Sequence, residues 1–182
     1  MVEVDNEREW VLASQAGDPA AFEALIRRHQ RMIHALTYRM TGSLADAEDL
    51  AQEAFIKAWE QLAGFRAEAK FSSWLYRIAV NLCLNWRNHE QRRQRAYQDF
   101  TPENNHDGGA DTLAVQVQEA LLKLPSKQRV AVILTTYEGM NHAQAAHLLG
   151  CSETTVSWRV FAARGKLKRL LKDLAPLKGD RP

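Results

Sequence analysis

Residues 140–160 read MNHAQAAHLLGCSETTVSWRV, and this stretch decides the fold of the C-terminal part of the chain. A first short helix ends at Gly150, which can take a left-handed conformation without steric penalty. Ser152 is a favourable N-cap for a second helix. The small Ala146, a glycine four residues later and Val156 six residues beyond that suit two helices that cross closely around a tight turn. The stretch therefore predicts a helix-turn-helix.

The second helix of this motif has an apolar side and a basic side. On a helical wheel with 100° per residue, one core stripe is formed by Val156, Val160, Ala163, Leu167, Leu170, Leu171 and Leu174. No acidic residue occurs between positions 159 and 172. Such a helix can place its first turns in the major groove of duplex DNA and hold phosphates with Lys and Arg, although a basic face can also be merely solvated. The predicted DNA contacts are Thr154, Thr155, Ser157, Trp158, Arg159, Arg164 and Lys168.

Two aromatic side chains of this helix fall outside its core stripe. Trp158 lies at about 200° and Phe161 at about 140° from Val156 on the wheel. Apolar rings outside a core indicate a contact surface. We expect them either to touch thymine methyl groups or to pack against an inhibitory partner protein.

Working outward from this motif, residues 101–111 interrupt the helical pattern with Pro, two Gly, two Asn and acids, and read as a flexible linker. We therefore predict an all-α protein with two small helical domains, residues 1–98 and 112–182, joined by a flexible acidic linker at residues 99–111. Residues 126–182 hold ten Lys and Arg against four acids. This charge suggests an anionic partner, such as a nucleic acid, for the C-terminal third alone.

The first domain shows helical spacing throughout. Asp18 and Pro19 predict the start of one helix and Thr41-Gly42 its end. A second helix is expected from Ser43 or Asp46 to about residue 62, and a third from about residue 72. In the second domain we expect helices near residues 112–124 and 126–137. The predicted core residues of the first domain are Phe22, Leu25, Ile26, His29, Ile33, Leu36, Ala47, Leu50, Ala51, Ala54, Phe55, Ala58, Leu62, Leu75, Ile78, Ala79, Leu82 and Trp86.

The third helix of the first domain has a second, polar stripe that is rich in asparagine. Asparagine is a weak helix former, and its amide can both donate to and accept from base edges. The loop before this helix carries aromatic and cationic side chains, which suit an unstacked base and its phosphate. Phe65 and Phe71 could instead hold the loop to the core. The candidate single-strand contacts are Phe65, Arg66, Lys70, Phe71, Arg77, Asn81 and Asn85.

Three motifs together resemble the extracytoplasmic-function sigma factors, group IV of the sigma-70 family. They are DAEDLAQEAFIKAW at residues 46–59, FSSWLYRIAVN at residues 71–81 and the helix-turn-helix. Their order matches regions 2 and 4 of that family. The run Ser157-Trp158-Arg159 departs from the family's usual pattern, and so does Ala162, where an arginine is common.

The resemblance implies a role for each motif. The helix of residues 46–59 would bind the clamp helices of the largest subunit of RNA polymerase, and these side chains also face away from the predicted core. Residues 65–71 and Asn81 would capture the melted non-template strand of the minus-ten element. The helix of residues 154–168 would read the minus-thirty-five element as duplex. The residues implied in polymerase binding are Asp46, Asp49, Gln52, Glu53 and Ile56.

The resemblance also implies the partners and the setting. The chain would direct core RNA polymerase to stress or envelope-response promoters, without catalytic chemistry or cofactor. An anti-sigma factor, often membrane-bound in this family, would hold it inactive. The N-terminus is acidic without an apolar core, so it is not a signal peptide, and no run is long enough to enter a membrane. We expect a cytoplasmic protein in which Cys83 and Cys151 are both reduced.

Two other functions compete with this interpretation. A stand-alone helix-turn-helix regulator would explain residues 112–174 but would leave the surface of residues 46–59 without a purpose. A metalloenzyme would need histidines that share a face. His29 and His34, like His142 and His147, are five residues apart and thus about 140° around a helix, so we expect no metal site.

Overall fold

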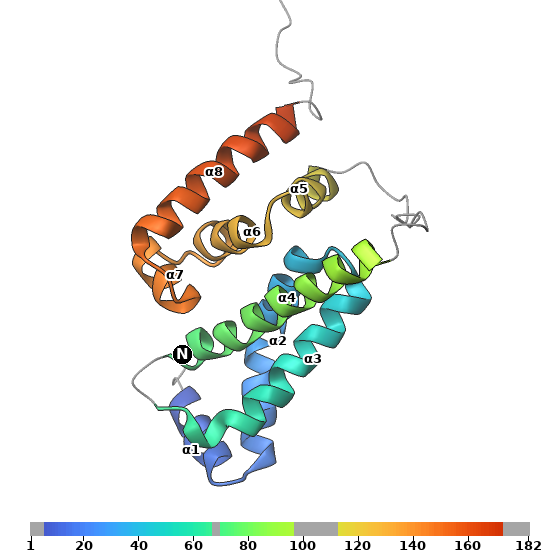
Figure 1. Ribbon diagram of the computed structural model, residues 1–182. Helices are drawn as coiled ribbons and strands as arrows, with labels where there is room; N and C mark the ends of the chain where they lie inside the picture. The colour runs from blue at the N-terminus through green and yellow to red at the C-terminus, as the bar shows by residue number, and fades with distance from the viewer. Residues whose placement is uncertain (1–5, 67–69, 97–112, 173–182) are drawn as a thin grey trace, which may run out of the picture. The chain divides into compact units, whose positions relative to one another are not determined.

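The computed structural model describes residues 6–66, 70–96 and 113–172, which form helices and turns with no strand among them (Figure 1). The all-α fold expected from the sequence is confirmed. Contacts between residues divide the chain into two units, residues 1–83 and 84–182. The predicted linker lies outside the described residues.

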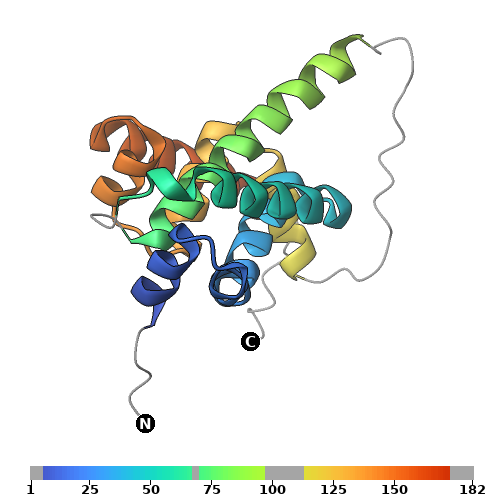
Figure 2. The same ribbon diagram turned by 90° about the horizontal axis from the view of Figure 1, so that it is seen from below.

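The helices of the N-terminal part follow one another with short connections. They are α1 (Glu7–Gln15), α2 (Pro19–Thr41), α3 (Leu44–Gln61), a 3-10 helix (Leu62–Gly64) and the long, continuous α4 (Phe71–Ala96; Figure 2). Asp18 caps α2, with its Oδ1 accepting a 2.9 Å hydrogen bond from the backbone N–H of Ala20. Gly42 ends α2 with a φ of 77°. Both ends of α2 are therefore where the sequence predicts them.

Helix α1 is not predicted by the sequence patterns above. It has only nine residues, and only Val11 and Ser14 are buried, so it shows no long apolar stripe. Its acidic first turn favours a helix N-terminus but does not reveal a core face.

Helices α2 and α3 form the core of the first unit. Small alanines on α3 are fully buried against α2 and let the two helices approach closely. The Thr37 hydroxyl of α2 donates a 2.9 Å hydrogen bond to the backbone oxygen of Ala47 on α3. Every predicted core residue on α3 is buried. Ile26, Leu82 and Trp86 are only half-buried.

The second unit contains a fully buried arginine next to its apolar core. Its helices are α5 (Leu113–Leu122), α6 (Ser126–Val132), a π-helical turn (Ile133–Tyr137), α7 (His142–Leu149) and α8 (Glu153–Lys172). Arg129 on α6 is fully buried, and its guanidinium donates to the backbone oxygens of Leu121 (2.8 Å), Leu122 and Leu124 (3.2 Å). Burial lowers the pKa of Arg129 to about 10. The side chain thus donates to carbonyls at and just after the end of α5, and the oxygen of Leu121 also accepts the backbone N–H of Leu124 at 3.0 Å.

The predicted helix of residues 126–137 ends at Tyr137, as expected, but its last turn is π-helical. The backbone N–H of Glu138 donates to the oxygen of Ile133, five residues earlier, at 3.2 Å. The wider turn places Gly139, with φ of 65°, at the start of the connection to α7. In the part of the chain that the structure describes, no helix is both long and apolar enough to cross a membrane.

Candidate nucleic-acid and protein interfaces

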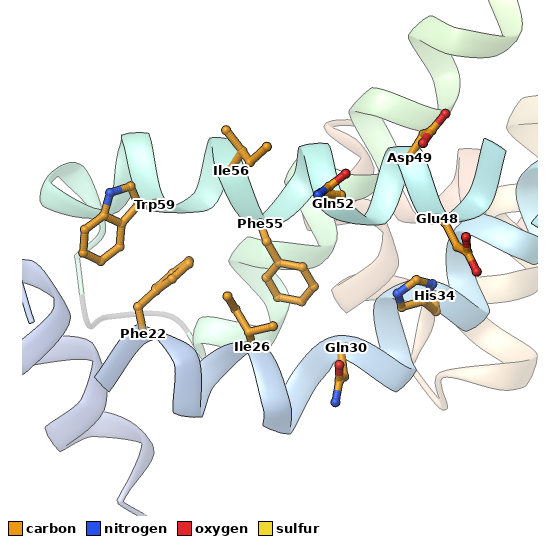
Figure 3. A pocket seen from close by; sticks show the side chains of 10 residues that line it. All are labelled: Phe22, Ile26, Gln30, His34, Glu48, Asp49, Gln52, Phe55, Ile56 and Trp59. Carbon is orange, nitrogen blue, oxygen red and sulfur yellow. The ribbon is translucent and has the colours of Figure 1, made fainter. Parts of the chain in front are cut away.

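The first unit carries a groove of about 650 Å³ between α2 and α3 (Figure 3). One end of the groove is apolar. Phe22 and Ile26 point from α2 toward α3, where Phe55 and Trp59 lie opposite them (Figure 3). The rings of Phe22 and Trp59 are 4.9 Å apart between centroids. The groove is lined by Phe22, Ile26, Gln30, His34, Glu48, Asp49, Gln52, Phe55, Ile56 and Trp59.

The α3 residues with an implied polymerase-binding role lie at or beside this groove. Asp49, Gln52 and Ile56 line it, and Ile56 is 52% exposed although it is a large apolar residue. Asp46 and Glu53 lie on the same helix outside the groove lining, and Glu53 forms a 3.7 Å ion pair with Lys57. A groove with an apolar end and acids along its rim can take an amphipathic helix that presents apolar and basic side chains.

The candidate single-strand segment is held by an aromatic cluster of Phe65, Phe71 and Trp74. Ring centroids within the cluster are 5.0 to 5.8 Å apart. His29 of α2 adds a fourth ring, 5.4 Å from Phe71. Both phenylalanines are buried, which agrees with the alternative that they fix the segment to the core. A contact of either ring with an unstacked base stays a prediction.

The charged and amide side chains of this region are exposed. Arg66 and Lys70 flank residues 67–69, which lie outside the described part. Arg77, Asn81 and Asn85 are spaced by four residues on α4 and are all exposed, so they share one solvent-facing side of the helix. This side can meet the bases and phosphates of a single strand.

The helix-turn-helix has the geometry that its sequence predicts. Gly150 has φ of 61° and ends α7 in the left-handed region. The hydroxyl oxygen of Ser152 then accepts a 3.2 Å hydrogen bond from the N–H of Thr155. Val156, Val160 and Ala163 of α8 are buried, as the wheel predicts, whereas the later residues of the predicted stripe, Leu167, Leu170 and Leu171, are only half-buried. Leu174 of the predicted stripe lies outside the described residues.

Three of the seven predicted DNA contacts on α8 already have partners within the chain. The Thr155 hydroxyl lies 2.8 Å from that of Ser152, and the Ser157 hydroxyl lies 2.8 Å from Nδ1 of His142. A guanidinium nitrogen of Arg159 lies 3.5 Å from Sγ of Cys151. All three side chains are half-buried. The spacing of residues in the sequence does not reveal these contacts within the chain.

The remaining predicted contacts on α8 are exposed. They are Thr154, Trp158, Arg164 and Lys168. Trp158 is 62% and Phe161 79% exposed, which confirms that both rings lie outside the core. The face therefore offers cations for phosphates together with two apolar rings.

The two cysteines differ in their surroundings, because Cys83 is buried and Cys151 is only half-buried. Both thiols are free, and burial raises the pKa of Cys83 to about 12, so that this thiol is not a nucleophile near neutral pH. Among the described residues, no group of three or more His, Cys, Asp or Glu is placed to hold a metal ion.

Comparison with known proteins identifies the family. A family model described as Sigma-70 region 2 matches residues 25–93, and one described as Sigma-70, region 4 matches residues 114–167. The chain belongs to the extracytoplasmic-function sigma factors. It is 38% identical over 171 residues to the ECF RNA polymerase sigma factor SigM of Mycobacterium tuberculosis, covering 91% of this chain and 85% of that protein. It is 34% identical over 165 residues to the ECF RNA polymerase sigma-E factor of Escherichia coli K12, covering 82% and 86%.

Two solved structures share the fold. CnrH in complex with the cytosolic domain of CnrY superposes with a TM-score of 0.70 at 27% identity, covering 93% of this chain and 99% of CnrH. The sigma factor RpoE of Bartonella quintana, in complex with the anti-sigma factor NepR, has a TM-score of 0.66 at 27% identity, covering 83% and 96%. This sigma factor accordingly directs RNA polymerase to promoters, and a stand-alone regulator is not favoured.

The region 2 groove of this sigma factor includes residues that sequence reasoning did not assign to a binding surface. The α2 side chains of Gln30 and His34 belong to no predicted site, and Phe22 and Ile26 were expected in the core. Trp59 closes the family-like motif but is 40% exposed at the apolar end of the groove. On the helical wheel, Ile26 lies at the edge of the α2 core stripe, and a residue at such an edge can face a groove. This position is a signal in the sequence that could have indicated the α2 wall of the groove.

Proposed function

We propose that the α2–α3 groove and its acidic rim bind the clamp helices of the polymerase, with Asp46, Asp49, Gln52, Glu53 and Ile56 as contacts. The observation that supports this most is an exposed Ile56 beside Asp49 and Gln52 in a groove whose other end is aromatic. An apolar side chain at the centre of a polar surface is typical of a docking site rather than of a solvated helix face.

The promoter contacts that we propose fall on two surfaces. Arg66, Lys70, Arg77, Asn81 and Asn85, which are exposed, bind the melted minus-ten strand. The phenylalanines at positions 65 and 71 are proposed to border the site of an unstacked base. On α8, the residues proposed to bind the minus-thirty-five duplex are Thr154, Thr155, Ser157, Trp158, Arg159, Arg164 and Lys168.

The division of the chain follows from these surfaces. We place the boundary of the region 2 domain after α4, at residue 98, with a linker at 99–111 and the region 4 domain at 112–182. The chain acts through binding alone, without catalytic chemistry of its own. Because its partner is RNA polymerase, we assign it to the cytoplasm, and we propose stress or envelope-response genes as its targets.

An anti-sigma factor is a further proposed partner. Two structurally similar proteins form complexes, CnrH with the cytosolic domain of CnrY and the sigma factor RpoE with the anti-sigma factor NepR. The groove and the exposed rings of Trp158 and Phe161 are apolar surfaces that such an inhibitor could cover.

The test of the groove uses a triple variant, Asp49→Ala with Gln52→Ala and Glu53→Ala. We expect its affinity for core polymerase to fall at least about tenfold, because several contacts near the centre of the interface are lost. Its thermal unfolding should match that of the wild type, since all three side chains are exposed. The measurement is a binding titration with purified core enzyme.

The matched control is Glu60→Ala, which removes an exposed acid from the same helix outside the groove lining. It should bind core polymerase like the wild type. A triple variant with unchanged affinity would contradict the assignment of the groove.

A further inference from the structure

Helix α1 is joined by hydrogen bonds to the point where the candidate single-strand segment begins. The side-chain amide of Gln15, at the end of α1, donates from Nε2 to the backbone oxygens of Leu62 (2.9 Å) and Phe65 (2.8 Å). One NH₂ group has two hydrogens, so both are used. These bonds link positions 47 and 50 residues apart in the chain. Figure 1 shows α1 beside the end of α3, where these residues lie.

The other end of the same segment is also connected to α1. Glu7, at the first turn of α1, has its Oε2 3.1 Å from Nε2 of His29 and 3.2 Å from Nε of Arg28. The buried His29 ring lies 5.4 Å from the ring of Phe71, which begins α4. The C-terminal end of α1 is therefore hydrogen-bonded to the backbone at Phe65. Its N-terminal end contacts His29, and the ring of His29 packs beside Phe71.

The two phenylalanines are the fixed points of the segment. Each is buried, and their rings meet edge to face at 5.8 Å. Arg66 follows Phe65 directly and Lys70 precedes Phe71 directly, and both cations are exposed. Contacts that hold the backbone at Phe65 and the ring of Phe71 therefore restrict the positions of Arg66 and Lys70.

We propose that α1 is a brace that pre-positions Phe65 with Arg66, and Lys70 with Phe71, for single-stranded DNA, with Gln15 as its principal positioning residue and Glu7 as the second. The proposal rests on the proposed minus-ten role of Arg66, Lys70 and their neighbours. A segment held in its binding geometry loses less conformational freedom when the DNA arrives, so the brace increases affinity without touching the ligand.

Two observations set this role apart from general stabilisation. Only Val11 and Ser14 of α1 are buried, so the helix adds little to the apolar core. It also precedes the residues matched by the region 2 model, which start at position 25. Helix α1 packs mainly against α2, but the side chain of Gln15 reaches past α2 to the backbone oxygen of Phe65, and Glu7 contacts His29, whose ring lies beside Phe71.

The experiment compares Gln15→Met, which keeps the length of the side chain but cannot donate, with Gln61→Met, the same change at an exposed glutamine on α3. The holoenzyme is reconstituted from the full chain and core polymerase. The probes are the non-template minus-ten strand, as single-stranded DNA, and the intact duplex of a promoter found by run-off transcription of genomic fragments. Hydrogen–deuterium exchange of the peptide covering residues 62–75 reports directly on how tightly the segment is held.

We expect Gln15→Met to bind the single strand about three- to thirtyfold more weakly, as for the loss of two hydrogen bonds that order a binding segment. Exchange in residues 62–75 should become faster, whereas binding to core polymerase and exchange in α3 should not change. Gln61→Met should behave like the wild type. If Gln15→Met does not fold, Glu7→Gln, which keeps a hydrogen-bonding group but removes the charge, should give the same pattern with a smaller effect.

The outcomes separate the brace from the function on which it rests. Single-strand affinity within twofold of the wild type, in a variant whose core binding is normal, would overturn the brace. An equal loss in core binding and in single-strand binding would also overturn it, because α1 would then only stabilise the domain. A wild-type holoenzyme that does not bind the single strand would instead refute the proposed minus-ten role itself, before any variant is compared.

Discussion

In the first unit the candidate protein interface is a groove made by two helices, whereas in the second unit the candidate interface for duplex DNA is the face of a single helix. The groove combines aromatic side chains at one end with acids and amides at the other. On α8, cations surround two exposed rings, and several hydroxyls are already bonded within the chain. The first surface is suited to binding by apolar burial, and the second to binding by charge.

The two units also differ in how their cores are made. The α2–α3 interface is packed from aliphatic residues and alanines, while the second unit buries an arginine among backbone oxygens. A buried cation that satisfies several carbonyls makes its unit sensitive to one substitution. Truncating a fully buried leucine of the first unit would cost a similar amount, about 2–5 kcal/mol, but through a cavity rather than through unpaired oxygens.

The largest effect is expected for Arg129→Leu. It leaves the oxygens of Leu121, Leu122 and Leu124 without the guanidinium, and we expect the second unit to lose about 2–4 kcal/mol of stability. Hydrogen exchange in increasing denaturant should show α6 and α8 opening earlier and α2 and α3 unchanged. Unaltered protection of α6 and α8 would show that the oxygens find other partners at no cost.

The salt dependence of the binding affinity should differ between the two interfaces. If α8 holds about three phosphates, affinity for promoter duplex should fall roughly tenfold to a hundredfold between 50 and 200 mM salt. Binding to core polymerase through the groove should change less, because its apolar end contributes burial that salt does not screen, and only its acidic rim is screened. Replacing both Arg164 and Lys168 with Ala should reduce the slope of log affinity against log salt by about 2. If log affinity fell with log salt at the same slope for promoter duplex and for core polymerase, α8 and the groove would not differ in how much of their binding depends on charge.

Arg159→Ala tests whether α8 reads sequence. If the guanidinium leaves Cys151 to bind a base, the variant should lose about 1–3 kcal/mol on its own promoter duplex and less on altered duplexes. A loss of equal size on every sequence would identify Arg159 as a phosphate contact. Arg164→Ala, at an exposed position, is the matched control and should weaken all duplexes alike.

The smallest effect concerns pH and the first unit alone. Burial, opposed by Glu7, lowers the pKa of His29 from its ordinary value of 6.5. The unfolded chain therefore binds more protons than the folded one, so stability is complete above about pH 6.5 and declines as the pH falls below it. Chemical denaturation at several pH values between about 5 and 7 should show this decline, and His29→Gln should reduce it. A wild type of constant stability over that range would contradict the buried, neutral His29.

The sequence predicts most of the fold because its signals are local. Asp18, Pro19 and Gly42 mark the ends of α2, and the alanine-rich stripe of α3 is buried as a whole. Helix α1 and the π-helical turn at 133–137 could not be predicted in this way. The first has too few apolar residues for a stripe, and the second depends on a backbone hydrogen bond that no residue type encodes.

The interfaces were predicted less completely, for a physical reason. A helical wheel separates buried from exposed positions on one helix, and it placed Ile56, Trp158 and Phe161 correctly outside the core. It cannot show that α2 supplies the other wall of the groove. Nor can it show that Ser157 is bonded to His142, because that bond joins two helices.

The central claim, that the two surfaces divide polymerase binding from duplex binding, is tested most directly by run-off transcription of genomic fragments from the source organism with purified core polymerase. The wild type, the Asp49/Gln52/Glu53 triple-alanine variant and the Arg164/Lys168 double-alanine variant are titrated. We predict discrete transcripts with the wild type, and the same transcripts with the triple variant only at higher concentration, because excess protein restores polymerase binding. The double variant should stay below the wild-type level when core polymerase is saturated. Full wild-type transcription by the triple variant at limiting concentration would contradict the account.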